Sequence, residues 1–190
     1  MKTYKSIIRH YTSHCRVNSQ REIDWFKSQD INGIIHNSSH AIDECGRRYF
    51  HQRRITKKAI FRAENIIRNN WKLISESKDF ENLHELLRKK LTHVFGLGDL
   101  YIYDTSFRIG AFLNLFPKQI YLHAGTKTGA RKLGIEIRNR TKIYKSDLPI
   151  EFRVLEPHES EDILCIYKTS FELIRQHKTL KPNAGSKCCQ

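Results

Sequence analysis

The chain has 190 residues, of which 39% are hydrophobic and 11% aromatic. This composition excludes a disordered basic tail, and the length suffices for a buried core in one domain or in two small lobes. Lysine and arginine number 34 against 20 acidic residues, which gives a formal net charge of +14. An excess of this size speeds the encounter with polyanions, so it favours a nucleic-acid partner over a merely basic surface or ribosome-like adhesion.

Targeting and metal-binding patterns are weak in this sequence. No apolar run approaches the ~18 residues of a membrane-spanning helix, and the N-terminus lacks the apolar stretch of a signal peptide. The five cysteines are scattered and odd in number, so we expect a reduced, cytoplasmic protein without a membrane partner. His36 and His40 share a helix face at i, i+4 spacing, but the sequence shows no third ligand, and no metal site is expected.

The first half of the chain is predicted to be helical. Apolar residues at helical spacing indicate helices over Glu22–Lys27 and Ile31–Glu44. Thr56 is the predicted N-cap of a long amphipathic helix, and Asp79 is that of a helix from Phe80 to Val94.

The second half alternates helical and extended segments. A helix is predicted from Asp99 to Phe116, in which Gly110 permits the close approach of another backbone. Residues 119–122 form an extended piece that leads to a short helix over Lys127–Leu133. The segment from Ile135 to Lys145 alternates isoleucine with arginine and is either a short strand or an extended arm.

The predicted fold is therefore mostly α, with a last helix after Pro157 and one short β element around residues 135–145. We expect an N-terminal helical region over residues 1–78, a second helical region over 79–177 and a flexible tail over 178–190. The alternative is one compact domain.

A glycine-rich turn is the most informative feature of the chain. Six of the nine glycines fall between Gly96 and Gly134. The turn Gly96-Leu97-Gly98 separates two predicted helices, and backbone N–H groups at the start of the second helix carry partial positive charge. Because this charge suits a phosphate, Gly96, Leu97 and Gly98 are predicted to hold a nucleic-acid backbone without reading bases.

Two helices joined by this turn resemble the helix-hairpin-helix motif of DNA-binding proteins. The matching positions are Leu91, Val94, Gly96, Gly98 and Ile109-Gly110-Ala111. The second helix is followed by a connector that contains a proline and by a helix that starts with small residues. This continuation resembles the version of the motif found in the 8-oxoguanine and endonuclease III-like DNA glycosylases. The resemblance covers residues 80–134 and implies a helical glycosylase-like fold with a hairpin that binds DNA phosphates. It also implies a monovalent cation at the hairpin carbonyls, and no other cofactor is expected.

Two positions depart from the pattern of this family. The catalytic lysine of its bifunctional members corresponds to Leu100, which cannot form a Schiff base. Lysine-dependent lyase chemistry is therefore not implied. The place of the catalytic aspartate falls nearest His123, which can act as acid or base near neutrality but supplies no fixed negative charge.

Candidate catalytic residues lie on the helix after the turn. Tyr101, Asp104 and Arg108 share one face at i, i+3 and i+7 spacing. Asp104 is predicted to orient His123, as a carboxylate holds a general base. Alternatively, Asp104 and Arg108 form a simple i, i+4 ion pair, and His123 makes a structural hydrogen bond or a phosphate contact.

Positive side chains continue beyond the turn. Those predicted to bind the nucleic-acid backbone are Lys127, Arg131, Lys132, Arg138 and Arg140. A second basic segment, Arg47 to Arg54, contains Tyr49 and Phe50, which either stack on unpaired bases or pack in the core or a hinge.

These features predict a DNA-binding protein similar to the hairpin glycosylases, with water-mediated excision of a damaged or modified base as its activity. Two alternatives stay open. One is a non-catalytic nucleic-acid adaptor in a larger assembly, and the other is an RNA-directed nuclease or toxin-like enzyme that uses His123 and Asp104. DNA is the preferred partner and RNA the alternative, and the sequence identifies no protein partner.

Overall fold

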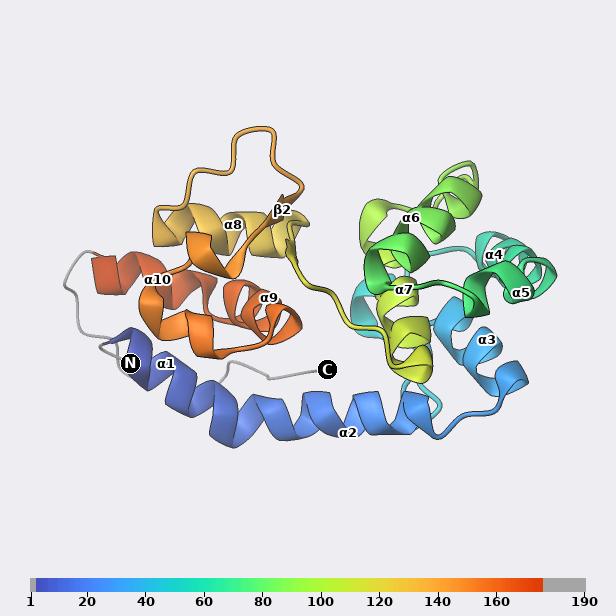
Figure 1. Ribbon diagram of the computed structural model, residues 1–190, viewed down its shortest axis with the longest axis horizontal. Coiled ribbons are helices and arrows are strands. Elements are labelled where there is room, and N and C mark those ends of the chain that lie inside the picture. The colour runs from blue at the N-terminus through green and yellow to red at the C-terminus, as the bar shows by residue number, and fades with distance from the viewer. Residues whose placement is uncertain (1–2, 176–190) are drawn as a thin grey trace. The chain divides into compact units, whose positions relative to one another are not determined.

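The computed structural model describes residues 3–175 and divides the chain into two compact units (Figure 1). Within the described residues, unit 1 comprises residues 3–19 and 118–175, and unit 2 comprises residues 20–117. The first boundary falls inside α2 (Arg16–Lys27). The sequence analysis instead placed a boundary after residue 78, and the tail that it predicted over 178–190 lies outside the described residues.

Unit 2 consists of helices that pack through their apolar faces. In chain order it contains the second part of α2, α3 (Ile31–His40), a 3-10 turn (Phe50–Gln52), α4 (Lys57–Asn69), α5 (Trp71–Ser75), α6 (Phe80–Leu91) and α7 (Asp99–Leu113). The core includes Ile34, Ile67, Leu83, Leu87 and Ile109. Because α7 packs against both α3 and α6, most of its length is buried.

Local sequence signals account for several features of unit 2. Thr56 Oγ1 accepts a hydrogen bond from the third residue of α4 (3.3 Å), and Asp79 Oδ1 accepts one from the third residue of α6 (2.8 Å). These caps satisfy donors that the first turn of a helix leaves unpaired. Gly110 confirms the predicted close approach, since a Cβ there would lie 2.6 Å from the carbonyl oxygen of Leu115.

Unit 1 combines helices with a small sheet. Its elements are α1 (Tyr4–His10), a π-helical turn (Tyr11–Cys15), the start of α2, β1 (Ile120–Tyr121), α8 (Ala124–Leu133), β2 (Lys142–Ile143), 3-10 turns at Lys145–Asp147 and Ile150–Val154, α9 (Pro157–Ile166) and α10 (Lys168–Arg175). The core includes Ile7, Tyr11, Phe152, Leu164 and Phe171. The helix α8 packs against α9 and α10.

The chain is mostly helical, as predicted. The strands β1 and β2 pair antiparallel, with Ile120 opposite Ile143. The strand β2 lies inside the segment from Ile135 to Lys145, for which the sequence allowed either a short strand or an extended arm. The helix α1 was not predicted, because its buried stripe runs on into Tyr11 and Cys15, and residues of these types weaken an apolar pattern. Within the described residues, no helix has both the length and the apolar character needed to cross a membrane.

Candidate functional site

The glycine turn, Gly96-Leu97-Gly98, lies on the surface of unit 2 between α6 and α7. The Leu97 N–H donates to the carbonyl oxygen of Val94 (3.1 Å), and Gly96 has a φ of 93°, a conformation that favours glycine. Gly98 is the N-cap of α7 and provides no capping side chain. No atom lies within 4 Å of the place that a Cβ on Gly98 would occupy. The N-terminus of α7 is therefore open to an external acceptor, although Asp99 places one acidic side chain in its first turn.

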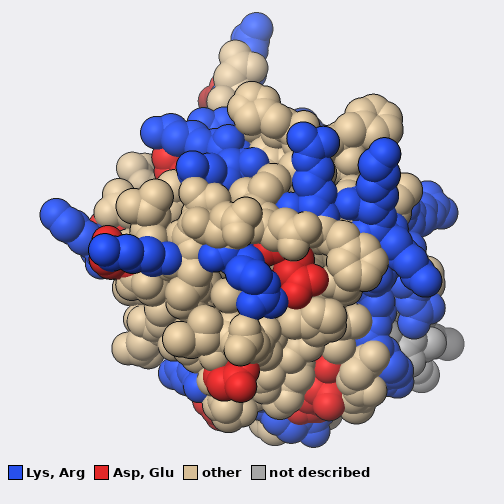
Figure 2. All heavy atoms as spheres, turned by 90° about the vertical axis from the view of Figure 1, so that its right-hand side faces the viewer, with Lys and Arg blue, Asp and Glu red and all other residues tan. Residues whose placement is uncertain are grey.

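Exposed cations flank this turn. A Cβ on Gly96 would lie 3.9 Å from the Ala59 side chain, so the turn is next to the first turn of α4. Lys57 and Lys58 begin that helix and are exposed, as is Lys90 near the end of α6. Figure 2 shows Lys and Arg side chains in several groups on this side of the molecule, mainly toward its top and its right-hand edge, with smaller acidic patches between them. Lys57 and Lys58 were not among the cations predicted to bind a nucleic-acid backbone.

Phe95, the residue before the turn, has no packing role in the fold. Its side chain is 97% exposed. A single exposed apolar residue is common on protein surfaces. Its position beside the open N-terminus of α7 nevertheless gives the turn an aromatic ring that can contact a base or a sugar.

The positive side chains that were predicted to bind the nucleic-acid backbone lie in unit 1. Lys127, Arg131 and Lys132 lie on α8, and Lys132 Nζ forms an ion pair with Glu172 Oε2 (2.8 Å). Arg131 is exposed, whereas Lys127 is half-buried.

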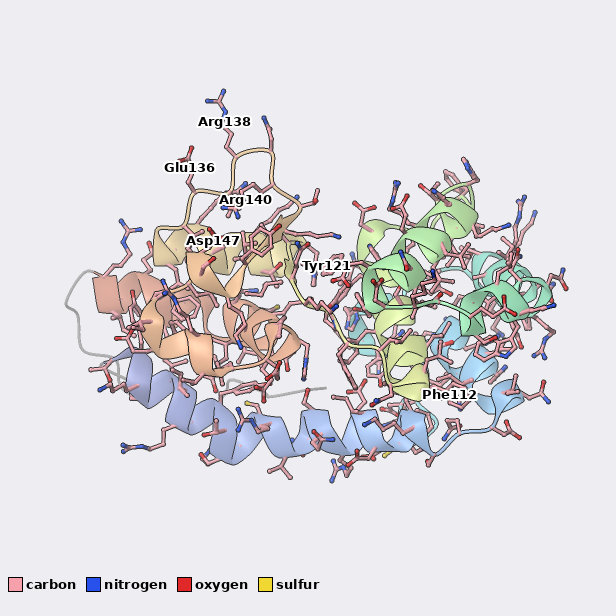
Figure 3. All side chains as sticks on the ribbon, viewed as in Figure 1. Phe112, Tyr121, Glu136, Arg138, Arg140 and Asp147 are labelled. Atoms are coloured by element: carbon pink, nitrogen blue, oxygen red, sulfur yellow. The ribbon has the colours of Figure 1, made fainter. Side chains whose placement is uncertain are left out.

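The loop that follows α8 carries the other two predicted cations. Arg138 extends from the outer end of this loop, while Arg140 lies back toward Asp147 (Figure 3). Arg140 Nη2 and Asp147 Oδ2 are 2.5 Å apart. Although partial burial opposes the effect, the hydrogen bond from Arg140 lowers the pKa of Asp147. The charges of Arg140 and Lys132 are therefore balanced within unit 1, which leaves Arg131 and Arg138 as the more available cations.

Tyr101 and Arg108, two of the predicted catalytic residues, are buried in unit 2. The Tyr101 hydroxyl donates to the carbonyl oxygen of Ser39 (2.7 Å), and burial raises its pKa to about 12. The Arg108 guanidinium lies over the ring of Tyr49, 4.4 Å from its centroid. Its Nη2 is 3.8 Å from Asp104 Oδ2, so the i, i+4 pair forms. Both side chains are therefore held inside the fold and are not reachable by a substrate.

Asp104 has a histidine partner that the sequence analysis did not identify. His51 Nε2 lies 2.8 Å from Asp104 Oδ2, and the side-chain amide of Gln52 donates to the same oxygen. The His51 side chain is 44% exposed, whereas that of Asp104 is 17% exposed. We call His51 and Asp104 the open pair. The carboxylate holds the imidazole by Nε2–H, which makes Nδ1 the basic nitrogen.

A second carboxyl group adjoins the open pair. The Tyr49 hydroxyl donates to Glu22 Oε1 (2.5 Å), and the Tyr49 ring centroid is 6.0 Å from that of His51. Burial raises the pKa of Glu22. Tyr49 is thus part of a partly buried polar network, in agreement with the packing alternative. Phe50 is exposed, with the Arg53 guanidinium over its ring. Clusters of titratable groups with shifted pKa values are typical of functional sites.

His123 lies in unit 1 at the start of α8. Its Nε2 is 2.6 Å from Glu161 Oε1, and both side chains are largely buried. The His123 backbone N–H donates to Thr126 Oγ1 (2.8 Å), which helps to begin the helix. We call His123 and Glu161 the closed pair. Asp104 and His123 belong to different units, so their predicted pairing remains a prediction.

Comparisons with known proteins identify no family for this chain. No family model matches it, and neither curated proteins nor solved structures provide a match. The resemblance of residues 80–134 to the hairpin glycosylases remains a prediction.

Proposed function

We propose that unit 2 binds nucleic acid, with duplex DNA as the preferred partner, through the glycine turn. The observation that carries this proposal is the exposed, uncapped N-terminus of α7, where Gly98 leaves room for a close approach. Backbone N–H groups at such a terminus are suited to a phosphate oxygen. The exposed Lys57, Lys58 and Lys90 add the long-range attraction that a polyanion requires.

Contacts of this kind favour binding without sequence specificity. Backbone amides and lysines hold phosphates and do not distinguish base pairs. The exposed ring of Phe95 supplies the apolar contact that a base or sugar at an opened step would accept. The protein is therefore expected to prefer distorted or damaged duplexes, in which a base is already less well stacked.

The chemistry that fits this partner is hydrolytic removal of a base, with the open pair as the general base. Asp104 fixes the His51 imidazole, and Nδ1 of that ring takes a proton from the water whose oxygen bonds to C1′ of the sugar. The N-glycosidic bond breaks, and the base leaves with its electron pair and then takes up the proton. His51 thereby takes the role that the sequence analysis gave to His123. No lysine adduct is required, in keeping with Leu100 at the position of the family's lysine.

Binding is tested by fluorescence anisotropy with a labelled duplex over a range of salt concentrations. Gly98→Glu places a carboxylate where the phosphate would lie, so we expect at least about a tenfold loss of affinity at low salt. Asn82→Glu is the matched control, because it adds the same charge near the opposite end of α6. Equal affinity of the two variants, or no duplex binding at low salt, would refute the proposal.

Activity is tested separately with oligonucleotides that carry a panel of base lesions. Abasic product supports the excision chemistry. Cleavage of RNA instead would favour the nuclease alternative, since an exposed imidazole can also activate a ribose 2′-hydroxyl. Tight binding with no product from any substrate would leave the adaptor function.

A further inference from the structure

A second cluster in unit 2, separate from the glycine turn and the open pair, contains metal-ligating side chains. His36 and His40 lie one turn apart on α3, and Glu64 faces them from α4. Glu64 Oε1 is 3.5 Å from His36 Nδ1, and Glu64 Oε2 is 2.8 Å from His40 Nε2. The three ligand atoms lie within 4.8 Å of one another. The sequence analysis expected no metal here because the third ligand is on a different helix.

These separations fit one shared ion. Zinc binds nitrogen and carboxylate oxygen at ~2.0–2.1 Å, so ligand atoms of a tetrahedral site lie roughly 3.3 Å apart. The 2.8 Å separation between His40 Nε2 and Glu64 Oε2 is close to that value, and the three ligand atoms lie within 4.8 Å of one another. Only a small rotation is required, and the His36 side chain, which is 52% exposed, is able to make it.

The surroundings hold the carboxylate in place. Arg68 Nη2 donates to Glu64 Oε1 (3.1 Å), and Arg68 Nη1 donates to Asn32 Oδ1 (2.8 Å). The guanidinium thus fixes one oxygen of Glu64 and leaves Oε2 directed toward His40. Hydrogen bonds of this kind orient metal ligands in protein sites. The ring of Phe61 packs against that of His40, with centroids 5.1 Å apart, and limits its rotation.

We propose that His36, His40 and Glu64 form a binding site for a divalent transition-metal ion of the zinc class. Two imidazoles and one carboxylate are ligands that zinc, cobalt and nickel accept, whereas calcium and magnesium prefer oxygen ligands alone. Three protein ligands leave one or more positions for water on the exposed side of His36. The ion links α3 to α4, so its binding stabilises unit 2. This inference does not depend on nucleic-acid binding.

Cobalt(II) is the probe for the test, because its visible absorption reports the ligands. The full-length protein is titrated with Co²⁺, and we expect a saturable visible band with a stoichiometry of one. His36→Ala and His40→Ala are each expected to weaken binding by at least about tenfold, since even the loss of a group that only orients a ligand costs ten- to hundredfold. His93→Ala, an exposed histidine of the same unit, is the matched control and should leave the titration unchanged.

The thermal unfolding midpoint provides an independent readout. Zn²⁺ should raise it for the wild type and for His93→Ala but not for His36→Ala. His36 is the more informative position, because its half-exposed side chain can be removed without disturbing the core. The proposal is overturned if Co²⁺ does not bind, if binding persists in both ligand variants, or if a thiolate charge-transfer band shows that cysteines such as Cys45 are the ligands.

Discussion

The open pair in unit 2 and the closed pair in unit 1 use the same chemistry in different surroundings. In the open pair, His51 Nε2 and Asp104 Oδ2 are 2.8 Å apart, and in the closed pair His123 Nε2 and Glu161 Oε1 are 2.6 Å apart. The imidazole is 44% exposed in the open pair and 17% exposed in the closed pair. An imidazole held by a carboxylate can exchange protons with a substrate only where the substrate can reach it.

The difference assigns separate roles to the two pairs. The open pair has a reachable imidazole and adjoins a partly buried network of Tyr49 and Glu22, as expected for a reactive site. The closed pair sits at the start of α8 and joins that helix to α9, as expected for a structural contact. Under the proposed function, exposure of the imidazole therefore selects the open pair over the closed pair as the general base.

The largest expected effect follows from removing His51. If the open pair supplies the general base, His51→Gln should lower turnover on the active substrate by roughly 10²- to 10⁴-fold. Single-turnover assays measure this loss, and circular dichroism checks that the fold is intact. Because the side chain is near the surface, little change in stability is expected. Unchanged turnover in His51→Gln would show that the open pair is not the reactive site.

Removing His123 should lower the stability of the fold and leave turnover nearly unchanged. His123→Ala removes the imidazole that lies 2.6 Å from the largely buried Glu161 carboxylate, and breaking a buried pair of this kind costs about 3 kcal/mol of unfolding free energy. Urea unfolding measures this loss, and Glu161→Gln is the companion variant. Single-turnover rates at a temperature where the variant is folded should stay close to those of the wild type. A selective loss of turnover with normal stability would reverse the two assignments.

The sequence predicted much of the fold because the relevant signals are local. Thr56 and Asp79 were identified as caps because each interacts with the third residue of its own helix. Gly110 was identified as a site of close backbone approach because glycine destabilises the interior of a helix and so indicates a packing requirement there. The glycine turn was located because glycine and apolar residues mark a helix boundary within a few positions.

The partners within the sites could not be predicted in this way. Asp104 and His123 were both identified, but His51 lies 53 residues before Asp104, and Glu161 lies 38 residues after His123. Glu64 is likewise 24 residues from His40. These pairings depend on which helices pack together, and no periodicity in the sequence encodes that. The two histidine pairs also differ in burial, and this difference likewise depends on which helices pack together.

The smallest expected effect concerns Glu22, and it tests whether the network beside the open pair is an acid–base system. Burial raises the pKa of Glu22 above its ordinary value of 4.5, so the folded state favours the protonated carboxyl. Its contribution to stability is complete below pH 4.5 and is lost as the pH rises through the raised pKa. Glu22→Gln stays neutral and keeps an acceptor for the Tyr49 hydroxyl. It should therefore match the wild type in acid and become more stable than the wild type as the pH approaches 7.

Tyr49→Phe provides the opposite control for this effect. The hydrogen bond from Tyr49 lowers the pKa of Glu22 and so partly offsets burial. Without that hydroxyl the folded carboxyl should hold its proton to a higher pH, and ionising it should cost more. Urea unfolding between pH 4 and pH 8 should then show the steepest decline in stability for Tyr49→Phe, an intermediate decline for the wild type and the shallowest for Glu22→Gln. Parallel curves for all three proteins would mean that the pKa of Glu22 is the same in the folded and unfolded states and that the network beside the open pair contributes only packing.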